Sequence, residues 1–531
     1  MRFIESNFGS DVLPKVGWQL DPFGHSRAVT RLYKNFDFEA HFLGRMDYQE
    51  YVTRKNANEM EFNWEGIFTS INSNVYWQPP GYCWDESCDV YREMGPSNNA
   101  FVQDDPLLEN YNVNEQVEGI LEFISEQSSP GYTTNNFMVT MGNDFHYRNA
   151  DIIFSNIDKL IEYLNLNGSV NALYSTPYCY AKAVLDSKPV EEFSIVSTDF
   201  FPYADGEFWP IDNRLDFESH SYWTGFYSSR PSFKEEIRSA SAYLRLFDYM
   251  GIVNYKYSRC TNELKRVLGL VQHHDAVTGT MKSHVLEDYR KRLQTSLNSC
   301  YARNFKFLRT EDDISARNGS DITIFNSLGW DRKVAINSHV HLVPAGGNVT
   351  LQYFKAEPGV CDDRICHLKN SAYRTEAEVS LVDNKFYLKS GKEEFSISWE
   401  YFLSQNSSDG KGASGAYLFR PVKNSENVMD LCSPEKITTF TMINPSSMIA
   451  SINCAGFMID MIFTVTLDIT IKYEIGQLPV GLDGPLTGTE LILRFHDINN
   501  LGGTEFYTDT NSNGYFACSA DINKFSLITS F

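Results

Sequence analysis

VGWQL at residues 16–20, followed by DPFGHS at residues 21–26, is the stretch on which the fold prediction depends. The short apolar run leads into a polar turn and a helical stretch, and a second apolar run ends in HFLGR at residues 41–45. Strand, loop, helix and strand in this order are typical of an α/β layer with parallel strands. We therefore predict that the fold begins with such a layer.

Two later segments repeat this rhythm, FMVTMGNDF at 137–145 and VNALYSTP at 170–177, and each is expected to contribute a further strand. Residues just past the carboxyl ends of strands in α/β sheets and barrels face the active-site crevice. Asp21, Arg45 and Asp144 occupy that position and are the first candidates for chemistry.

The pattern becomes helical between about residues 229 and 307. Tyr289, Leu293 and Leu297 recur every four residues on one face, as an amphipathic helix requires. Two or three packed helices are expected. One of them carries GLVQHHDAVTG (269–279) near its end, where the final glycine would terminate it.

After about residue 315 the pattern becomes β-rich. TVTLDITI at 464–471 is the clearest predicted strand, because its apolar residues alternate with polar ones. One or two β-sandwich domains are expected there. The predicted organisation is an α/β domain over residues 1–220, a helical domain over 221–312 and β-sandwich domains over 313–531.

The charge balance limits the class of partner. Lys and Arg number 46 against 68 Asp and Glu, so the net charge is −22. Such a field repels nucleic acids and acidic membrane surfaces, and neither is an expected partner. The sequence has no apolar run of about 18 residues that could cross a membrane. Its first twenty residues lack the pattern of a secretory signal.

Cysteines and sequons nonetheless indicate an oxidising secretory compartment. A zinc knuckle is the alternative for the close cysteine pairs, but it needs shorter spacers and nearby His, so disulfides are favoured. The candidate pairs are Cys83 with Cys88, Cys260 with Cys300, and Cys361 with Cys366. Sequons for N-glycosylation begin at Asn167, Asn318, Asn348 and Asn406.

Each candidate residue also has a plain structural explanation. Asp21 could act as a helix cap or a turn residue, and Asp144 could bond its own backbone. His273 and His274 are adjacent, so on a helix only one of them can face a given site. Taken singly, none of these residues identifies an activity.

Taken together, GWQLDPFGHS (17–26), GNDF (142–145) and QHHDAVTGT (272–280) resemble, in this order, glycoside hydrolase family 38, the retaining class II α-mannosidases. The lysosomal branch is the most similar. The resemblance runs from about residue 8 to about residue 515. Further matching segments are FLGRMDYQEY (42–51), CWDESC (83–88), LYSTPYCY (173–180), DFFPYADG (199–206), YWTGFYSSRP (222–231) and FYTDTNSNG (506–514).

The resemblance implies a fold and a set of site residues. An incomplete seven-stranded α/β barrel-like catalytic domain would be followed by a three-helix bundle and C-terminal β-sandwich domains. Asp21 would be the catalytic nucleophile and a zinc ligand, Asp144 the general acid/base, and His274 a second zinc ligand. The substrate-binding residues would be Phe23, Arg45, Trp223 and Asp275.

These residue types suit a retaining glycosidase, which needs two carboxyl groups about 5 Å apart. Arg45 and zinc would keep Asp21 ionised for attack on the anomeric carbon, whereas Asp144 would have to be protonated, as an acidic compartment favours. The implied cofactor is Zn²⁺, the implied substrate a mannose-containing oligosaccharide, and the implied location the lysosome or the secretory pathway. A homo-oligomer is compatible with the sequence.

The chain departs from the family pattern at the zinc site. The family uses four ligands, two of them a His-x-Asp pair upstream of DPFGHS, and the twenty residues before Asp21 contain no His. We expect the chain to begin inside the catalytic domain, to stop before the last β region, and to leave Cys179 as an odd thiol. Because two ligands would not hold zinc tightly, the alternative function is a truncated, inactive homologue with at most weak sugar binding.

Overall fold

The structure is a computed structural model, and contacts within the chain divide it into two compact units. One unit is Met1–His220 with Asp509–Tyr515, and the other is Ser221–Thr508 with Phe516–Phe531. Each unit is described by itself. The described residues are 2–71, 101–125, 130–141, 147, 150–205, 221–253, 258–304, 319–336, 339–353, 361, 364–371, 373–382, 385–403, 415–419, 429–430, 437–444, 446–454, 457–465, 469–475, 489–497, 505–509 and 515–519.

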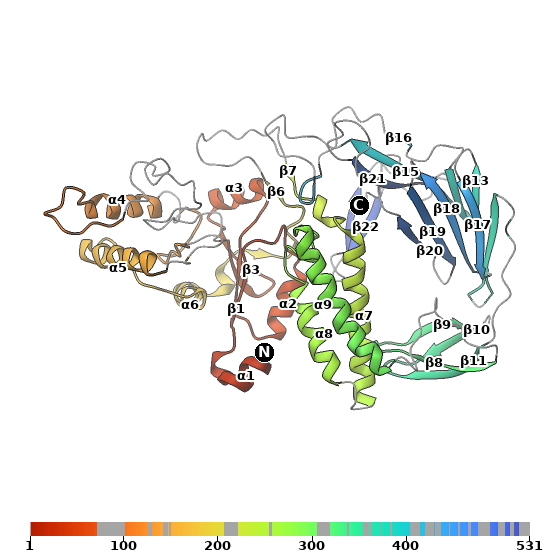
Figure 1. Cartoon of the computed structure of the whole chain (residues 1–531). Coiled ribbons are helices and arrows are strands. Elements are labelled where there is room, and N and C mark those ends of the chain that lie inside the picture. Colours follow the sequence, from red (N-terminus) through yellow and green to blue (C-terminus); the bar gives the residue numbers. More distant parts are fainter. Residues whose placement is uncertain are drawn as a thin grey trace. The chain divides into compact units, whose positions relative to one another are not determined.

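A five-stranded sheet forms the centre of the first unit (Figure 1). The order is β1-β2-β4-β3-β5, in which β1, β2 and β4 run parallel and a two-residue turn makes β3 antiparallel to β4. The predicted α/β layer is thus present, although the described strands form an open sheet and not a closed barrel. The strands are β1 (Val16–Gln19), β2 (Ala40–Leu43), β3 (Glu61–Trp64), β4 (Ile67–Ile71) and β5 (Ile195–Val196), with a short β6 (Ala204–Asp205) beyond them.

Apolar side chains cover both faces of this sheet because successive residues of β2 point to opposite sides. Phe42 packs with Tyr180 and Val184 of α6 on one face, whereas Leu43 packs with Phe62 and Trp64 on the other. Burial of each such side chain stabilises the fold by about 1.5–3 kcal/mol. The helices of this unit are α1 (Arg2–Phe8), α2 (Ala28–Asn35), α3 (Tyr48–Ala57), α4 (Val113–Phe123), α5 (Ala150–Asn167) and α6 (Pro177–Ser187).

The predicted strand at 170–177 is wrong, because the chain there forms no strand before α6 begins at Pro177. Of the predicted strand at 137–145, the described residues 137–141 contain a single β-bridge residue, Thr140, and belong to none of the strands of the sheet. The apolar residues of both segments pack against the core between α4 and α5 instead of entering the sheet. The side-chain amide of Asn165 bonds both the N–H and the carbonyl of Ala172, at 2.9 Å each. These backbone groups therefore have partners without a neighbouring strand.

Glu61 on β3 is a buried carboxyl group in this unit, with 3% of its surface exposed. One carboxyl oxygen accepts hydrogen bonds from Tyr180 (2.7 Å) and Ser70 (3.5 Å), and the other has no partner among the described residues. Burial raises the pKa of Glu61 from its ordinary 4.5 to about 7, against the opposite effects of these two hydrogen bonds and of Lys188.

We expect Glu61→Gln to change how the stability of the protein depends on pH. The folded state holds the Glu61 proton more tightly than the unfolded state does, so the wild-type protein loses stability as the pH rises from about 4.5 to 7. The variant lacks this loss. Its unfolding free energy relative to wild type should rise by up to about 3 kcal/mol between pH 4.5 and pH 7.5 in urea titrations.

Glu39→Gln is the matched control, because the exposed Glu39 carboxylate also accepts a hydrogen bond from a tyrosine of α6, Tyr178. Its difference from wild type should be the same at both pH values. An equally flat difference for Glu61→Gln would contradict the buried, protonated state of Glu61.

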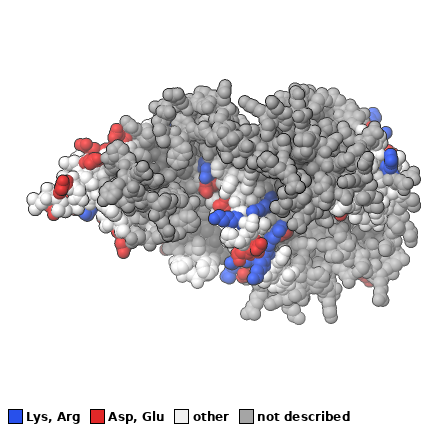
Figure 2. Space-filling view, turned by 45° about the horizontal axis from the view of Figure 1, so that its top comes forward, with Lys and Arg blue, Asp and Glu red and all other residues white. Residues whose placement is uncertain are grey.

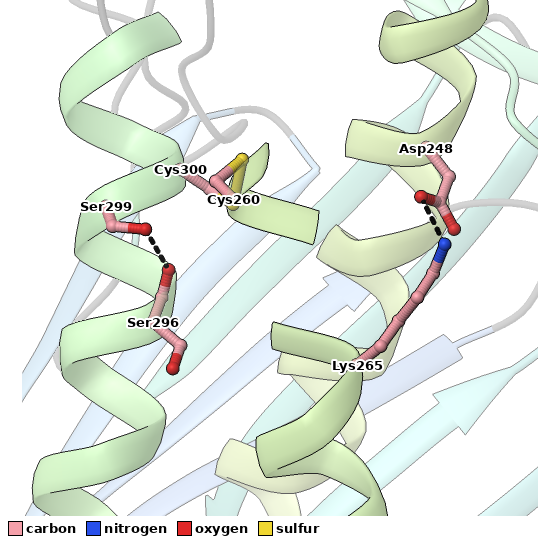
Figure 3. The surroundings of a disulfide bond; sticks show 6 residues. All are labelled: Asp248, Cys260, Lys265, Ser296, Ser299 and Cys300. Atoms are coloured by element: carbon pink, nitrogen blue, oxygen red, sulfur yellow. Dashed lines mark hydrogen bonds and ion pairs between the residues drawn. A yellow bond between two sulfur atoms is a disulfide. The ribbon is translucent and has the colours of Figure 1, made fainter. Parts of the chain in front are cut away.

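Three helices follow β7 in the described part of the second unit, where the sequence predicted two or three, and they pack around one core (Figure 1). Leu293 is fully buried there and the predicted neighbours Tyr289 and Leu297 pack beside it. A disulfide joins Cys260 to Cys300, and Lys265 pairs with Asp248 across two helices (Figure 3). The helices are α7 (Pro231–Val253), α8 (Ser258–Leu270) and α9 (Ser283–Asn304), preceded by the two-residue strand β7 (Ser221–Tyr222).

Antiparallel sheets follow α9 in the described part of this unit. The six-stranded sheet of β12 to β16 and β21 shares one hydrophobic core with the four-stranded sheet of β17 to β20, while β8 pairs with β11 and β9 with β10. Cys361 and Cys366 form a second disulfide. The strands are β8 (Ser320–Phe325), β9 (Arg332–Ile336), β10 (His339–Val343), β11 (Asn348–Tyr353), β12 (Ile365–Asn370), β13 (Thr375–Val382), β14 (Lys385–Ser390), β15 (Glu393–Leu403), β16 (Met429–Asp430), β17 (Ile437–Asn444), β18 (Ser447–Cys454), β19 (Phe457–Val465), β20 (Ile469–Ile475) and β21 (Thr489–Asp497). The paired strands β22 (Glu505–Asp509) and β23 (Tyr515–Ser519) also belong to this unit, except for their residues Asp509 and Tyr515.

The predicted single strand at 464–471 is wrong, because it spans the end of β19 and the start of β20. Val465 faces Ile469 across the antiparallel pair, and Phe463 faces Ile471. Residues opposite each other point to the same side of a sheet. Val465 and Ile469 are four residues apart and point to the same side of the sheet. The apolar residues therefore still alternate with polar ones in the sequence, although the chain reverses direction between the two strands.

The described helices include none that is both long and apolar enough to cross a membrane. On the face drawn in Figure 2, the charged side chains at the described end that carries α4 and α5 are mostly acidic. This agrees with the net charge of −22.

Candidate active site

Asp21 and Arg45 lie together at the carboxyl edge of the sheet. Each follows a strand by two residues, and β1 and β2 are parallel neighbours paired in register, with Gln19 opposite Leu43. The ladder continues past the strands through the bond from the Arg45 N–H to the Leu20 carbonyl (3.2 Å). The Arg45 guanidinium Nε donates to Asp21 Oδ1 at 2.5 Å. The predicted placement of both residues at strand ends is therefore confirmed.

The surroundings of this pair favour a charged arginine. Burial would lower the pKa of Arg45, but the nearby Tyr203 and Asp21 outweigh it and the pKa is raised. Arg45 Nη1 also donates to the Tyr203 hydroxyl at 3.4 Å. Asp21 keeps 43% of its side chain exposed, so a ligand can reach its carboxylate.

The turn that carries Asp21 is held by His25. The imidazole Nε2 of His25 lies 2.9 Å from the Arg45 carbonyl oxygen, and burial lowers the pKa of His25 to about 4, so the neutral ring donates this bond. Backbone bonds between His25 and Phe200 fix the turn at 3.0 and 2.8 Å. Gly24 adopts φ +125°, and a Cβ there would lie 2.3 Å from the Phe201 ring. These contacts fix the conformation of the segment DPFGHS, which carries the Asp21 carboxylate.

The aromatic residues expected to line the sugar pocket have different environments. Phe23 is 3% exposed, and its ring lies beneath the guanidinium of Arg45, 5.9 Å from Cζ to the ring centroid. Trp223 belongs to the second unit and is partly buried, with its ring 5.1 Å from that of Tyr417. Phe23 therefore supports the Arg45 side of the site from below.

His273, His274 and Asp275 form a cluster in the loop that joins α8 to α9. Their ligand atoms all lie within 4.8 Å of one another, and the two imidazole rings are 4.1 Å apart. The predicted continuation of the helix to residue 279 is wrong, because α8 ends at Leu270 and a series of tight turns follows. Without helical geometry, both adjacent imidazoles can turn to one side.

Hydroxyl groups of the same loop fix this cluster. Thr280 donates to Asp275 Oδ1 at 2.7 Å, and Thr278 donates to the His274 carbonyl at 2.7 Å. His273 Nε2 lies 3.6 Å from Asp275 Oδ2. Asp275 is therefore held between an imidazole and a hydroxyl.

The cluster suits zinc in its chemistry. Two imidazoles and a carboxylate are the donors that Zn²⁺ prefers when sulfur is absent, and bonds of about 2 Å bring such donors within a few ångströms of one another. His274 offers one of the ligand atoms of this cluster.

The remaining predicted site residue, Asp144, lies outside the described residues, as do Cys83 and Cys88. Cys179 is an exposed free thiol, as expected. Sequence reasoning did not assign roles to His25, Tyr203 or Thr280, although all three lie inside or beside the quoted motifs. Only their contacts distinguish them from ordinary core or loop residues.

Comparisons with known proteins find two family domains along the chain. Residues 1–206 match the glycosyl hydrolases family 38 N-terminal domain, and residues 221–304 match the alpha mannosidase middle domain. Lysosomal alpha-mannosidase of Bos taurus is 29% identical over 596 residues, covering 96% of this chain, and that of Cavia porcellus is 36% identical over 322 residues, covering 56% of this chain. The chain spans 56% and 30% of the length of these two relatives, respectively.

An alpha-mannosidase from Enterococcus faecalis V583 has a similar structure, with a TM-score of 0.57 at 12% identity over 94% of this chain and 64% of that one. At this identity the similarity concerns the fold alone. The two family domains follow each other along the chain, the first containing Asp21 and Arg45 and the second His274 and Asp275. The chain therefore belongs to glycosyl hydrolase family 38, a family of glycosidases, and carries both its N-terminal and its alpha-mannosidase middle domain.

Proposed function

We propose that this protein is a retaining exo-α-mannosidase that removes terminal α-D-mannosyl residues from N-glycan oligosaccharides. The observation that carries the proposal is the ion pair of Asp21 with Arg45 at the carboxyl ends of two parallel strands. An exposed carboxylate paired with a fixed cation suits a glycosidase nucleophile. The choice of mannose as the sugar rests on the names of the alpha-mannosidase relatives.

In the first step, the Asp21 carboxylate would attack the anomeric carbon and form a glycosyl ester as the glycosidic bond breaks. Asp144 would give its proton to the leaving oxygen. In the second step, a water molecule would attack the same carbon while Asp144 takes a proton from that water. The ester bond to Asp21 breaks, which releases mannose and restores the Asp21 carboxylate. Arg45 is charged throughout and stabilises the carboxylate before attack and after release.

Asp21 and His274 would hold the zinc ion, which supplies Lewis-acid stabilisation of the sugar hydroxyl oxygens when bound. Asp275, fixed by Thr280, would accept hydrogen bonds from the sugar. Trp223 would offer an apolar face to the ring, and Phe23 would support the Arg45 guanidinium.

The proposed domain organisation follows the same assignment. Residues 1–220 would be the catalytic α/β domain, part of a seven-stranded barrel-like fold. Residues 221–312 would be a three-helix bundle that carries His274, and residues 313–531 the β-sandwich domains.

Hydrolysis of an aryl α-D-mannoside tests the proposal. We expect release of the aryl alcohol by the full chain at acidic pH, saturation with substrate, and loss of activity on treatment with a zinc chelator. The matched aryl β-D-mannoside and α-D-glucoside should not be cleaved. Cleavage of all three, or cleavage that is indifferent to the chelator, would contradict the assignment.

A homologue that binds mannosides without hydrolysing them is the second candidate. Asp275, held by Thr280, and the exposed Asp21 carboxylate would serve this function as hydrogen-bond acceptors for sugar hydroxyls. Mannoside binding in calorimetry without any turnover of the aryl mannoside would support this candidate.

We further propose a lysosomal location and an N-glycan on Asn167. The named relatives include lysosomal enzymes, and Asn167 is an exposed sequon residue at the end of α5, where the Ser169 N–H donates to its side-chain oxygen at 3.3 Å. Mass spectrometry of the peptide that contains Asn167, from protein secreted by eukaryotic cells, should show a glycan. An unmodified peptide would contradict this proposal.

A further inference from the structure

Lys234 makes an unusually complete set of contacts with the loop that carries the histidine cluster. It lies in the first turn of α7, and its ammonium Nζ donates to the backbone carbonyls of Ser229 (2.7 Å), Val277 (2.8 Å) and Thr278 (2.6 Å). An ammonium group has three N–H donors, so each one has a carbonyl acceptor. Two of the three acceptors belong to the loop that follows His274 and Asp275.

The position of Lys234 is unfavourable for the helix itself. A cation in the first turn faces the positive end of the helix dipole. Burial and the neighbouring Arg230 lower the pKa of Lys234 to about 8. The local electrostatics therefore oppose a cation here, and the loop carbonyls are the groups that compensate for it.

The backbone packing on the other side of this contact is equally close. Gly279 adopts φ +80°, and a Cβ there would lie 2.3 Å from the Ser229 carbonyl oxygen. Ser229 Oγ donates to the Gly279 carbonyl at 3.1 Å, and an Arg230 guanidinium nitrogen donates to the Met281 carbonyl. The loop is thus attached to the residues just before α7 at several successive positions.

These contacts lead directly to the cluster. Thr278, whose carbonyl Lys234 binds, donates its hydroxyl to the His274 carbonyl and lies 2.9 Å from the Thr280 hydroxyl. Thr280 in turn donates to Asp275. Loss of the Lys234 hydrogen bonds would therefore alter the positions of His274 and Asp275 through the hydroxyl groups of Thr278 and Thr280.

We propose that Lys234 is a positioning residue that holds loop 273–280 in the conformation in which the donor atoms of His274 and Asp275 converge. It acts through the loop and touches neither the zinc ion nor the sugar. The role of that loop in binding zinc and sugar rests on the proposed function, but the mechanical role of Lys234 does not.

Lys234→Met in the full chain tests the proposal, since methionine keeps the apolar stem and removes all three donors. Hydrogen exchange followed by mass spectrometry should show at least tenfold faster exchange of backbone amides in 272–281, because the variant loses three hydrogen bonds from a charged donor. Exchange in α9 and in the β-sheets should stay within about twofold of wild type. The zinc dissociation constant should rise at least tenfold.

Lys265→Met is the matched control, because Lys265 is in the same three-helix group but pairs with Asp248 on the surface. It should leave both the loop exchange and the zinc affinity unchanged. Lys234→Gln keeps a neutral amide group with two N–H donors and should give the same changes in reduced size. This second variant covers the case in which Lys234→Met does not fold.

Unchanged exchange in loop 272–281 would overturn the proposal, as would an equal increase throughout α7, α8 and α9, which would mean a merely structural role. A wild-type protein that binds no zinc would instead count against the proposed function. The loop exchange would still decide the role of Lys234 in that case.

Discussion

Asp21→Asn is expected to lower kcat for hydrolysis of an aryl α-mannoside by a factor of roughly 10³ or more, the scale on which essential catalytic groups act. The amide of asparagine is nearly isosteric with the carboxylate but cannot form the glycosyl ester. It also leaves the Arg45 guanidinium without its charged partner at 2.5 Å. The loss should appear in kcat, because the substitution keeps the shape of the site.

Asp288→Asn is the matched control for this substitution. Asp288 also pairs with an arginine, Arg292 at 2.6 Å, but this pair lies exposed on α9. Both variants should unfold within about 1 kcal/mol of wild type, since exposed and partly exposed ion pairs contribute little to stability. An Asp21→Asn variant with near wild-type turnover would remove Asp21 from the mechanism.

Removal of the Cys260–Cys300 disulfide is expected to destabilise the three-helix group by about 4 kcal/mol. The bond joins the start of α8 to the end of α9 and closes a loop between residues 40 positions apart (Figure 3). Cross-linking this loop restricts the unfolded chain, and the entropic estimate for that length is about 4 kcal/mol. Both cysteines are buried, so a Cys260→Ala/Cys300→Ala double variant avoids burying a polar group.

The Cys361→Ala/Cys366→Ala variant provides the comparison, because this disulfide closes a loop of only five positions. Its loss should be about 2 kcal/mol by the same estimate. Urea unfolding monitored by hydrogen exchange in α8 and α9 should separate the two effects. A larger loss of stability in α8 and α9 from removing Cys361–Cys366 than from removing Cys260–Cys300 would contradict this prediction.

Strand periodicity and chain order were enough to predict where Asp21 and Arg45 lie. Both residues follow apolar runs, and parallel strands with a connecting helix bring such ends to one edge. The structure adds that they are in direct contact. The sequence offered Cys260 and Cys300 as a candidate pair because both flank the same helical segment, without fixing the connectivity, and the structure joins them.

Predictions failed where tertiary contacts replaced the local pattern. The segment at 170–177 is apolar enough for a strand, yet the Asn165 amide satisfies the backbone of Ala172 and the side chains turn to α5. The segment at 464–471 kept its alternation through a hairpin. Neither the hydrogen bonds of Asn165 nor the hairpin can be recognised from the periodicity of the sequence alone.

The supporting residues of the site were the least predictable. His25 acts through the carbonyl of Arg45, and Lys234 through carbonyls of residues more than forty positions away. Backbone carbonyls are the same in every sequence, so a contact with one of them cannot be predicted from residue types. Only the path of the folded loops determines which carbonyls these side chains reach.

The most direct test of the account is to trap the glycosyl-enzyme intermediate with a fluorinated mannosyl donor that forms this intermediate faster than it hydrolyses. After proteolysis, mass spectrometry locates the added mannosyl group. The account predicts one adduct per chain, on the side chain of Asp21. An adduct on another carboxylate, or none at all, would contradict it.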